Sequence, residues 1–166
     1  MRLTWALLLT LLLSSCGYHL VGQGESTVIP HGVETAWLEA DASSQGQALQ
    51  LELAALWQEN SRLPALHDVK PNKAHVTVRI EQVHETFSPI GFDAAGLAVQ
   101  YRLSISATLR MYQAGSLIWQ ASGVLVSADV FAGNDPSVIE SERARLTKQL
   151  QISWAKSALA RLQSGF

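Results

Sequence analysis

Cysteine, charge and long apolar runs are all scarce in this sequence. Its 166 residues include one cysteine, so no intramolecular disulfide can form and a disulfide-stabilised scaffold is excluded. Charged residues make up 16% of the chain, below the usual value of about a quarter, and they form no basic block of the kind that binds nucleic acid. After Cys16, polar residues interrupt every apolar run, and none reaches the ~17–25 residues that a membrane-spanning helix needs. We therefore expect neither a membrane span nor a nucleic-acid partner.

The one sustained apolar run lies at the N-terminus. Arg2 is followed by Leu3–Leu13, and small residues then lead to Cys16. Positive charge, roughly 7–15 apolar residues and small residues, in that order, are typical of a secretory signal. Leu13-Ser14-Ser15-Cys16 also resembles the lipobox of bacterial lipoproteins, in which the cysteine becomes the lipidated N-terminus. We interpret residues 1–15 as a lipoprotein signal peptide.

The lipobox resemblance implies that Cys16 carries an S-linked diacylglycerol and an N-linked palmitate. Each buried methylene contributes about 0.8 kcal/mol and one acyl chain binds only marginally, so several chains would make a firm anchor. The residue after the cysteine is Gly17 and not an aspartate. By the same resemblance, this implies that the protein is exported to the cell outer membrane. Cleavage without lipidation, or a free thiol, are the alternatives for Cys16.

Residues 16–34 are rich in glycine and show no period, which predicts a tether. Residues 35–40 predict a short strand, and residues 45–62 predict an amphipathic helix that Pro64 ends. The turn before this helix offers Asp41, Ser43 and Ser44 as N-caps. The apolar stripe of the helix makes Trp57 a core residue.

A strand with alternating apolar residues follows over 74–81, and its phase slips afterwards, which predicts a bulge near Gln82. Residues 88–93 predict a loop with apolar residues at its tip. From Leu97 to Met111 every odd position is apolar or aromatic, which predicts one long strand with one buried and one polar face.

Gln113-Ala114-Gly115 predicts a turn, and residues 117–129 predict its hairpin partner. Residues 137–162 predict a long final helix with an apolar stripe: Leu146, Leu150, Trp154, Ala158 and Leu162. The expected fold is α+β, a single two-layer domain over 35–166. Its mixed sheet has four strands in the order strand–helix–strand–strand–strand–helix, and both helices pack on one face.

The sequence predicts no enzyme, metal site or cofactor. Its five histidines are scattered, and none is paired with cysteine or a carboxylate at the spacing of a zinc motif. Nucleophile-elbow, phosphate-loop and dinucleotide motifs are absent.

The basic residues have two interpretations. They form a solvated surface, or some of them contact the phosphates of an anionic glycolipid. The candidates for such contact are Lys148 and Arg143 on the final helix and Arg102 on the open face of the long strand.

Several features together resemble the LptE family of lipopolysaccharide (LPS)-assembly lipoproteins. They are Cys16-Gly17-Tyr18-His19-Leu20 at the expected mature N-terminus, the order of elements, Val99-Gln100-Tyr101 at the start of the long strand, and Ser141-Glu142 followed by Lys148 on the last helix.

The resemblance implies an α/β domain seated as a plug in the outer-membrane β-barrel LptD, as a heterodimer. The pair would deliver LPS to the outer leaflet, and Lys148 is the first candidate for LPS contact. The alternative is a periplasm-facing binding module of another envelope-maintenance system, which the generic α/β pattern would also serve.

Overall fold

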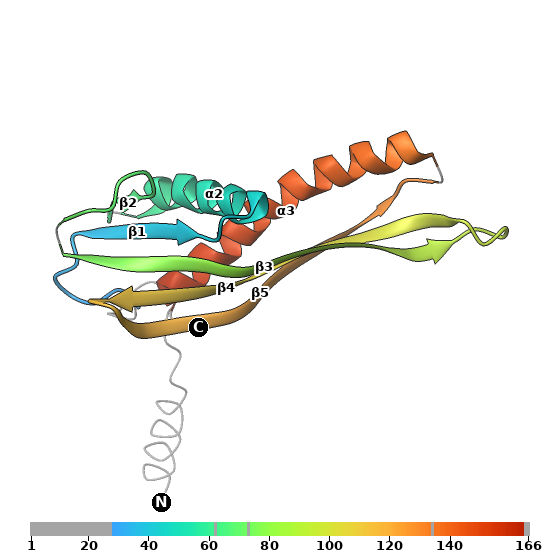
Figure 1. Ribbon diagram of the computed structural model, residues 1–166. Coiled ribbons are helices and arrows are strands. Elements are labelled where there is room, and N and C mark those ends of the chain that lie inside the picture. The colour runs from blue at the N-terminus through green and yellow to red at the C-terminus, as the bar shows by residue number, and fades with distance from the viewer. Residues whose placement is uncertain (1–27, 62, 73, 134, 165–166) are drawn as a thin grey trace, which may run out of the picture.

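The computed structural model contains a five-stranded mixed sheet with two helices on one of its faces (Figure 1). It describes residues 28–61, 63–72, 74–133 and 135–164. The elements are β1 (Thr35–Ala40), α2 (Ser44–Asn60), β2 (Ala65–Leu66), β3 (His75–Phe92), β4 (Ala98–Gln113), β5 (Ser116–Phe131) and α3 (Pro136–Ser164). The predicted α+β class is confirmed. The signal peptide and Cys16 lie outside the described residues.

The prediction of four strands was wrong, because β2 adds a fifth and changes the order of the elements. The sheet order is β2-β1-β3-β4-β5. β2 pairs in parallel with β1, and the amide of Ala36 also donates to the carbonyl of Pro64 at 2.9 Å. Two residues are too short to show an alternating pattern, so β2 exists only through its pairing with β1.

Helix α2 starts and ends on local signals. The side chain of Ser43 accepts a hydrogen bond from the amide of Gly46 at 2.9 Å, which makes Ser43 the N-cap among the three candidates. The amide of Ser61 bonds to the carbonyl of Trp57 at the other end. Trp57 is buried, as predicted, and its indole donates to the carbonyl of Leu63 at 2.9 Å.

Two bulges flank one residue of β4. The pairing of β3 with β4 shifts between Glu81 and His84, where Gln82 has a φ of 55°, so the predicted bulge is confirmed. The pairing of β4 with β5 shifts between Ala107 and Leu109, opposite Gly123, which has a φ of 61°. Thr108 lies between the two bulges, is buried and donates to the side-chain oxygen of Gln82 at 2.9 Å.

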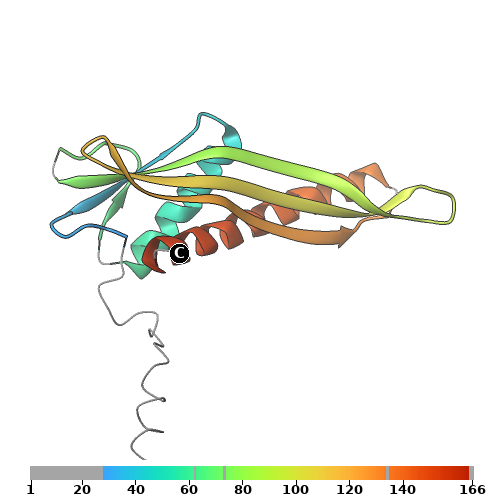
Figure 2. The ribbon, with the colours of Figure 1, turned by 90° about the horizontal axis from the view of Figure 1, so that it is seen from below.

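The core occupies only part of the length of the sheet. The odd positions of β4 are buried from Leu103 to Met111, as predicted. Leu97 is exposed and precedes the strand, and the predicted loop at 88–93 is replaced by a continuation of β3 to Phe92. Residues 88–92 form strand because they pair with β4. Leu97 is exposed because the β3–β4 hairpin extends beyond α3, so no second layer covers it (Figures 1 and 2).

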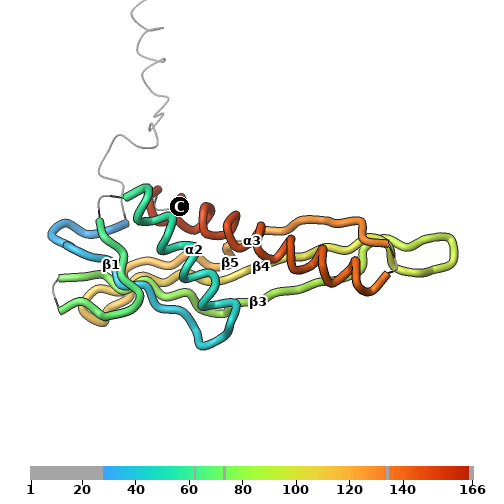
Figure 3. The backbone as a smooth tube through the Cα atoms, turned by 90° about the horizontal axis from the view of Figure 1, so that it is seen from above, coloured from blue at the N-terminus to red at the C-terminus, as the bar shows by residue number. Residues whose placement is uncertain are grey.

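Helix α3 begins after Asp135, whose carboxylate accepts bonds from the amide and hydroxyl of Ser137 at 2.9 and 2.7 Å. Its predicted apolar stripe is buried. In Figure 3, seen from above, the two helices lie over the sheet, with α2 against β1 and β3 and α3 against β4 and β5. Within the described residues, neither helix is long and apolar enough to span a membrane.

Two pairs of terms describe positions on the sheet. The proximal end holds the β4–β5 turn, and the distal end holds the β3–β4 turn. The helix face carries α2 and α3, and the open face is the opposite one, which Figure 2 shows from below. Val28, Ile29 and Val33, from the predicted tether, pack partly buried against the core.

Candidate functional site

Exposed apolar side chains gather at the distal end. The pairing places Phe131 of β5 opposite Gln100, which is itself paired with Gly91 next to Phe92. Phe92 and Phe131 are 61% and 73% exposed. We call this group the distal apolar cluster: Ile90, Phe92, Leu97 and Phe131. Several large exposed apolar side chains at one end of a domain are candidates for an interaction site.

The distal turn is held in shape by one carboxylate. Asp93 accepts bonds from the amides of Ala95 and Leu97, both at 2.9 Å, and Gly96 adopts a φ of 80° in the same turn. The hairpin therefore presents its apolar side chains on an ordered support, although the turn packs against no helix (Figure 1).

Arg143 lies on the helix face beside the base of this hairpin. It donates to the largely buried carboxylate of Glu85 at 3.0 Å, and its guanidinium lies 5.5 Å from the ring centroid of Phe87. The Phe87 ring in turn stacks on Tyr101 with centroids 5.0 Å apart. A guanidinium over an aromatic ring gains cation–π attraction, so Arg143 links α3 to β3 directly and to Tyr101 of β4 through Phe87.

Arg102 lies on the open face, on the other side of the sheet. Its Nε and one terminal nitrogen donate to the two carboxylate oxygens of Asp129 at 2.7 and 2.9 Å. This two-point hydrogen bond lowers the pKa of Asp129 and raises the pKa of Arg102. The pair is solvent-exposed, so it fixes the orientation of Arg102 more than it stabilises the fold.

Lys148 lies on α3, where it forms an ion pair with Glu52 of α2. The structure therefore places Lys148 and Arg143 along one helix and Arg102 on the opposite face, and the three do not form one site. Each is paired with a carboxylate: Lys148 with Glu52, Arg143 with Glu85, and Arg102 with Asp129.

Sequence reasoning missed these three carboxylates and the Phe87–Tyr101 stack. The partners stand 96, 58 and 27 positions apart in the chain, and no local pattern connects them. The register of the β4–β5 hairpin could have found the Arg102–Asp129 pair, but two register shifts, between Met111 and Tyr112 and between Ala107 and Leu109, move the count by two residues. Among the described residues, no group of three or more histidine, cysteine or acidic side chains could hold a metal ion.

Comparison with known proteins gave no matching family model and no matching curated protein sequence. Solved structures do match. A minor lipoprotein from Acinetobacter baumannii aligns with a TM-score of 0.65 and 13% identity over 82% of this chain and 94% of that one. The chain shares its fold with bacterial lipoproteins.

Two further structures agree. Uncharacterized lipoprotein B from Nitrosomonas europaea aligns with a TM-score of 0.63 and 15% identity, covering 90% of this chain and 92% of that one. Rare lipoprotein B from Shewanella oneidensis aligns with a TM-score of 0.53 and 14% identity over 77% and 89% of the two chains. At these identities the likeness concerns the fold alone.

Proposed function

We propose that this protein is an envelope lipoprotein, anchored in the outer membrane through Cys16, that assembles LPS into the outer leaflet together with the LptD barrel. The lipobox, the mature N-terminal sequence Cys16-Gly17-Tyr18-His19-Leu20 and the fold shared with bacterial lipoproteins support it.

The observation that carries the proposal is the distal extension of the sheet. The β3–β4 hairpin projects past α3 and carries most of the distal apolar cluster, while the middle of the open face carries short hydroxyl side chains. Thr86, Ser104 and Ser127 form one such row across β3, β4 and β5. Large outer-membrane barrels have polar interiors, so a narrow sheet with hydroxyls on its face and apolar residues at its tip suits insertion into a lumen.

LPS contact in this proposal runs along α3, with Lys148 first and Arg143 second. Both are cations held in place by a carboxylate, and in this proposal a phosphate oxygen takes the place of that carboxylate. Arg102 faces the other side of the sheet and would contact a different part of the ligand or the barrel wall.

The test is recovery of the partner. The full-length lipoprotein, tagged at its C-terminus, is extracted in mild detergent and purified, and co-purifying proteins are identified by mass spectrometry. We expect one large barrel protein in near-equal amount. Recovery of the lipoprotein alone would overturn the proposal.

Substitutions test which surface of the lipoprotein contacts the barrel. The double change Phe92→Asp and Phe131→Asp puts charge on the distal apolar cluster and should lower barrel recovery several-fold. Leu51→Asp is the matched control, since Leu51 is 55% exposed on α2 and lies outside that cluster. If equal amounts of the barrel co-purify with both variants, the interface does not lie at the distal end.

Depletion separates the proposal from a binding module of another envelope system. Loss of an LPS route should cause hypersensitivity to large antibiotics and accumulation of LPS outside the outer leaflet. If LPS still reaches the outer leaflet normally after depletion, the protein is instead a binding module of another envelope system.

A further inference from the structure

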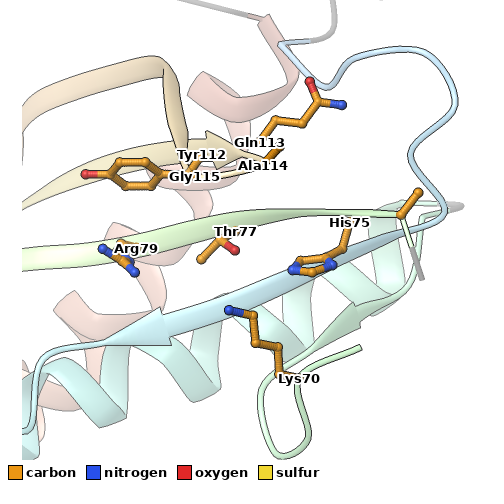
Figure 4. Close-up of a pocket in the computed structure, with 9 residues that line it drawn as sticks. Lys70, His75, Thr77, Arg79, Tyr112, Gln113, Ala114 and Gly115 are labelled. Carbon is orange, nitrogen blue, oxygen red and sulfur yellow. The ribbon is translucent and has the colours of Figure 1, made fainter. Parts of the chain in front are cut away.

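A cavity of about 530 Å³ lies on the open face at the proximal end, far from the distal apolar cluster (Figure 4). Three segments form it: the loop after β2, the first half of β3, and the end of β4 with its turn into β5. The residues used in the argument are Lys70, His75, Thr77, Arg79, Tyr112 and Gly115. Its volume is within the ~300–1,000 Å³ typical of small-molecule sites.

The charge of the cavity wall has one sign. Lys70 and Arg79 are cations, His75 adds a third nitrogen-bearing side chain, and no carboxylate is among the described residues that line the cavity. Glu39, on β1, accepts from the Nε of Arg79 at 2.7 Å, and among the described residues the two terminal nitrogens of Arg79 have no hydrogen-bond acceptor. Such a fork matches the oxygens of a phosphate or carboxylate.

The rest of the wall suits a sugar. The guanidinium of Arg79 lies 4.9 Å from the ring centroid of Tyr112, which orients both groups. Thr77 is 8% exposed and forms part of the floor with its hydroxyl, and it is paired with Tyr112 across the sheet. An aromatic ring beside hydroxyl groups gives an apolar surface with hydrogen-bonding partners, which matches the two kinds of surface on a saccharide. The cavity is also much larger than one phosphate.

We propose that this cavity binds a phosphorylated saccharide, with Arg79 and Lys70 on the phosphate and Tyr112 and Thr77 against the sugar. The same chemistry can come from a free sugar phosphate or from the headgroup of a glycolipid. The glycolipid source rests on the proposed function, whereas the free sugar phosphate does not.

The test uses the full-length lipoprotein in detergent micelles with three probes: glucose 1-phosphate, inorganic phosphate and glucose. Binding is measured by titration calorimetry and by the NMR shifts of the Thr77 and Gly115 amides. Glucose 1-phosphate should bind saturably and more tightly than either of the other two. Equal affinity for inorganic phosphate, or no binding of glucose 1-phosphate, would overturn the proposal.

Four variants assign the contacts. Arg79→Gln and Lys70→Gln should each weaken binding by about tenfold, because each removes a charged hydrogen-bond donor. Glu39→Gln should tighten binding, because it removes the negative charge that neutralises Arg79. Arg110→Gln is the matched control, since Arg110 is a cation on the same face that is paired with Glu81 outside the cavity. An unchanged affinity in Arg79→Gln, with an intact NMR spectrum, would also overturn the proposal.

A second arm distinguishes the two sources by titrating LPS micelles. Weaker binding of both LPS and glucose 1-phosphate in Arg79→Gln assigns the cavity to a glycolipid headgroup. Weaker binding of glucose 1-phosphate alone assigns it to a free sugar phosphate. Neither titration contains the barrel protein. A failed pull-down therefore contradicts the proposed function, whereas a failed titration contradicts the proposed binding at the cavity.

Discussion

The indole Nε1 of Trp154 donates a hydrogen bond to the carbonyl oxygen of Val124 at 2.9 Å, and both residues are buried. The bond joins the middle of α3 to β5 next to the bulge at Gly123. It fixes the position of the helix along the strand within the covered part of the sheet.

Trp154→Phe should destabilise the protein, because the carbonyl of Val124 loses its partner in a buried position. A buried polar group without a partner costs about 1–3 kcal/mol, and the smaller ring adds a packing loss. The free energy of unfolding from urea titration measures this. Leu51→Ala, at an exposed position of α2, should change it by less than about 0.5 kcal/mol. Equal effects of the two changes would contradict the role of the bond.

Gly123→Ala should cost about 1 kcal/mol of unfolding free energy, because alanine resists the left-handed backbone that this bulge requires. Gly123 has a φ of 61°, and a Cβ built there meets no atom within 4 Å, so the cost is conformational and not steric. Gly123→Asn should cost less, since asparagine tolerates this conformation. A larger loss with asparagine than with alanine would argue for a hidden clash. Thermal unfolding of both variants measures the difference.

Lys148→Ala and Glu52→Ala should have opposite effects on LPS affinity. Their ion pair is exposed at Lys148, so each change should alter the free energy of unfolding by less than about 1 kcal/mol. Lys148→Ala removes the proposed phosphate contact and weakens binding, whereas Glu52→Ala releases Lys148 from its carboxylate and strengthens it. Titration of LPS into the purified lipoprotein gives both affinities. A loss in both variants would assign the pair a structural role.

Glu39→Gln should reveal a pH-dependent contribution to stability. Burial alone would raise the pKa of Glu39, but hydrogen bonds from Trp37 and Arg79 and the charge of Arg79 outweigh it and lower the pKa below its ordinary value of 4.5. A carboxylate with a lowered folded pKa stabilises the fold above its unfolded pKa, and this contribution is lost as the pH falls through the folded pKa.

The stability gap between the native protein and Glu39→Gln should therefore be full at neutral pH and should close as the pH falls below 4.5. Urea titrations at a series of pH values measure the gap. Trp37→Phe removes one of the two side chains that donate hydrogen bonds to Glu39. When Glu39→Gln is made in the Trp37→Phe background, it should therefore change the free energy of unfolding by less at neutral pH. A gap that stays constant down to about pH 3 would contradict the assignment.

Much of the local structure followed from short patterns. The stripe that includes Leu150 and Trp154 predicted the buried side of α3, and Ser43 was one of three predicted caps. The phase slip after residue 81 located the bulge at Gln82. These succeed because helix and strand periods, caps and bulges depend on residues close together in the chain.

The candidate site was less accessible to prediction. Alternation along β4 identified which face of the strand is apolar, but it could not indicate that Leu97 lies beyond the end of α3 and stays exposed. Basic residues were identified as candidates, but their carboxylate partners and the separation of Arg102 from Lys148 depend on how distant segments pack. The signal peptide and the lipidation of Cys16 stay predictions.

By itself the sequence determined the helices, the long alternating strands and the scarcity of charge, since each depends on the residue type and its near neighbours. Only the tertiary structure decided that two residues after Pro64 form a fifth strand and that the β3–β4 hairpin extends beyond α3. It also decided that Arg79, Lys70 and Tyr112 line one cavity. The physical reason is that pairing register and layer packing join residues far apart in the chain, and these contacts leave no period in the sequence.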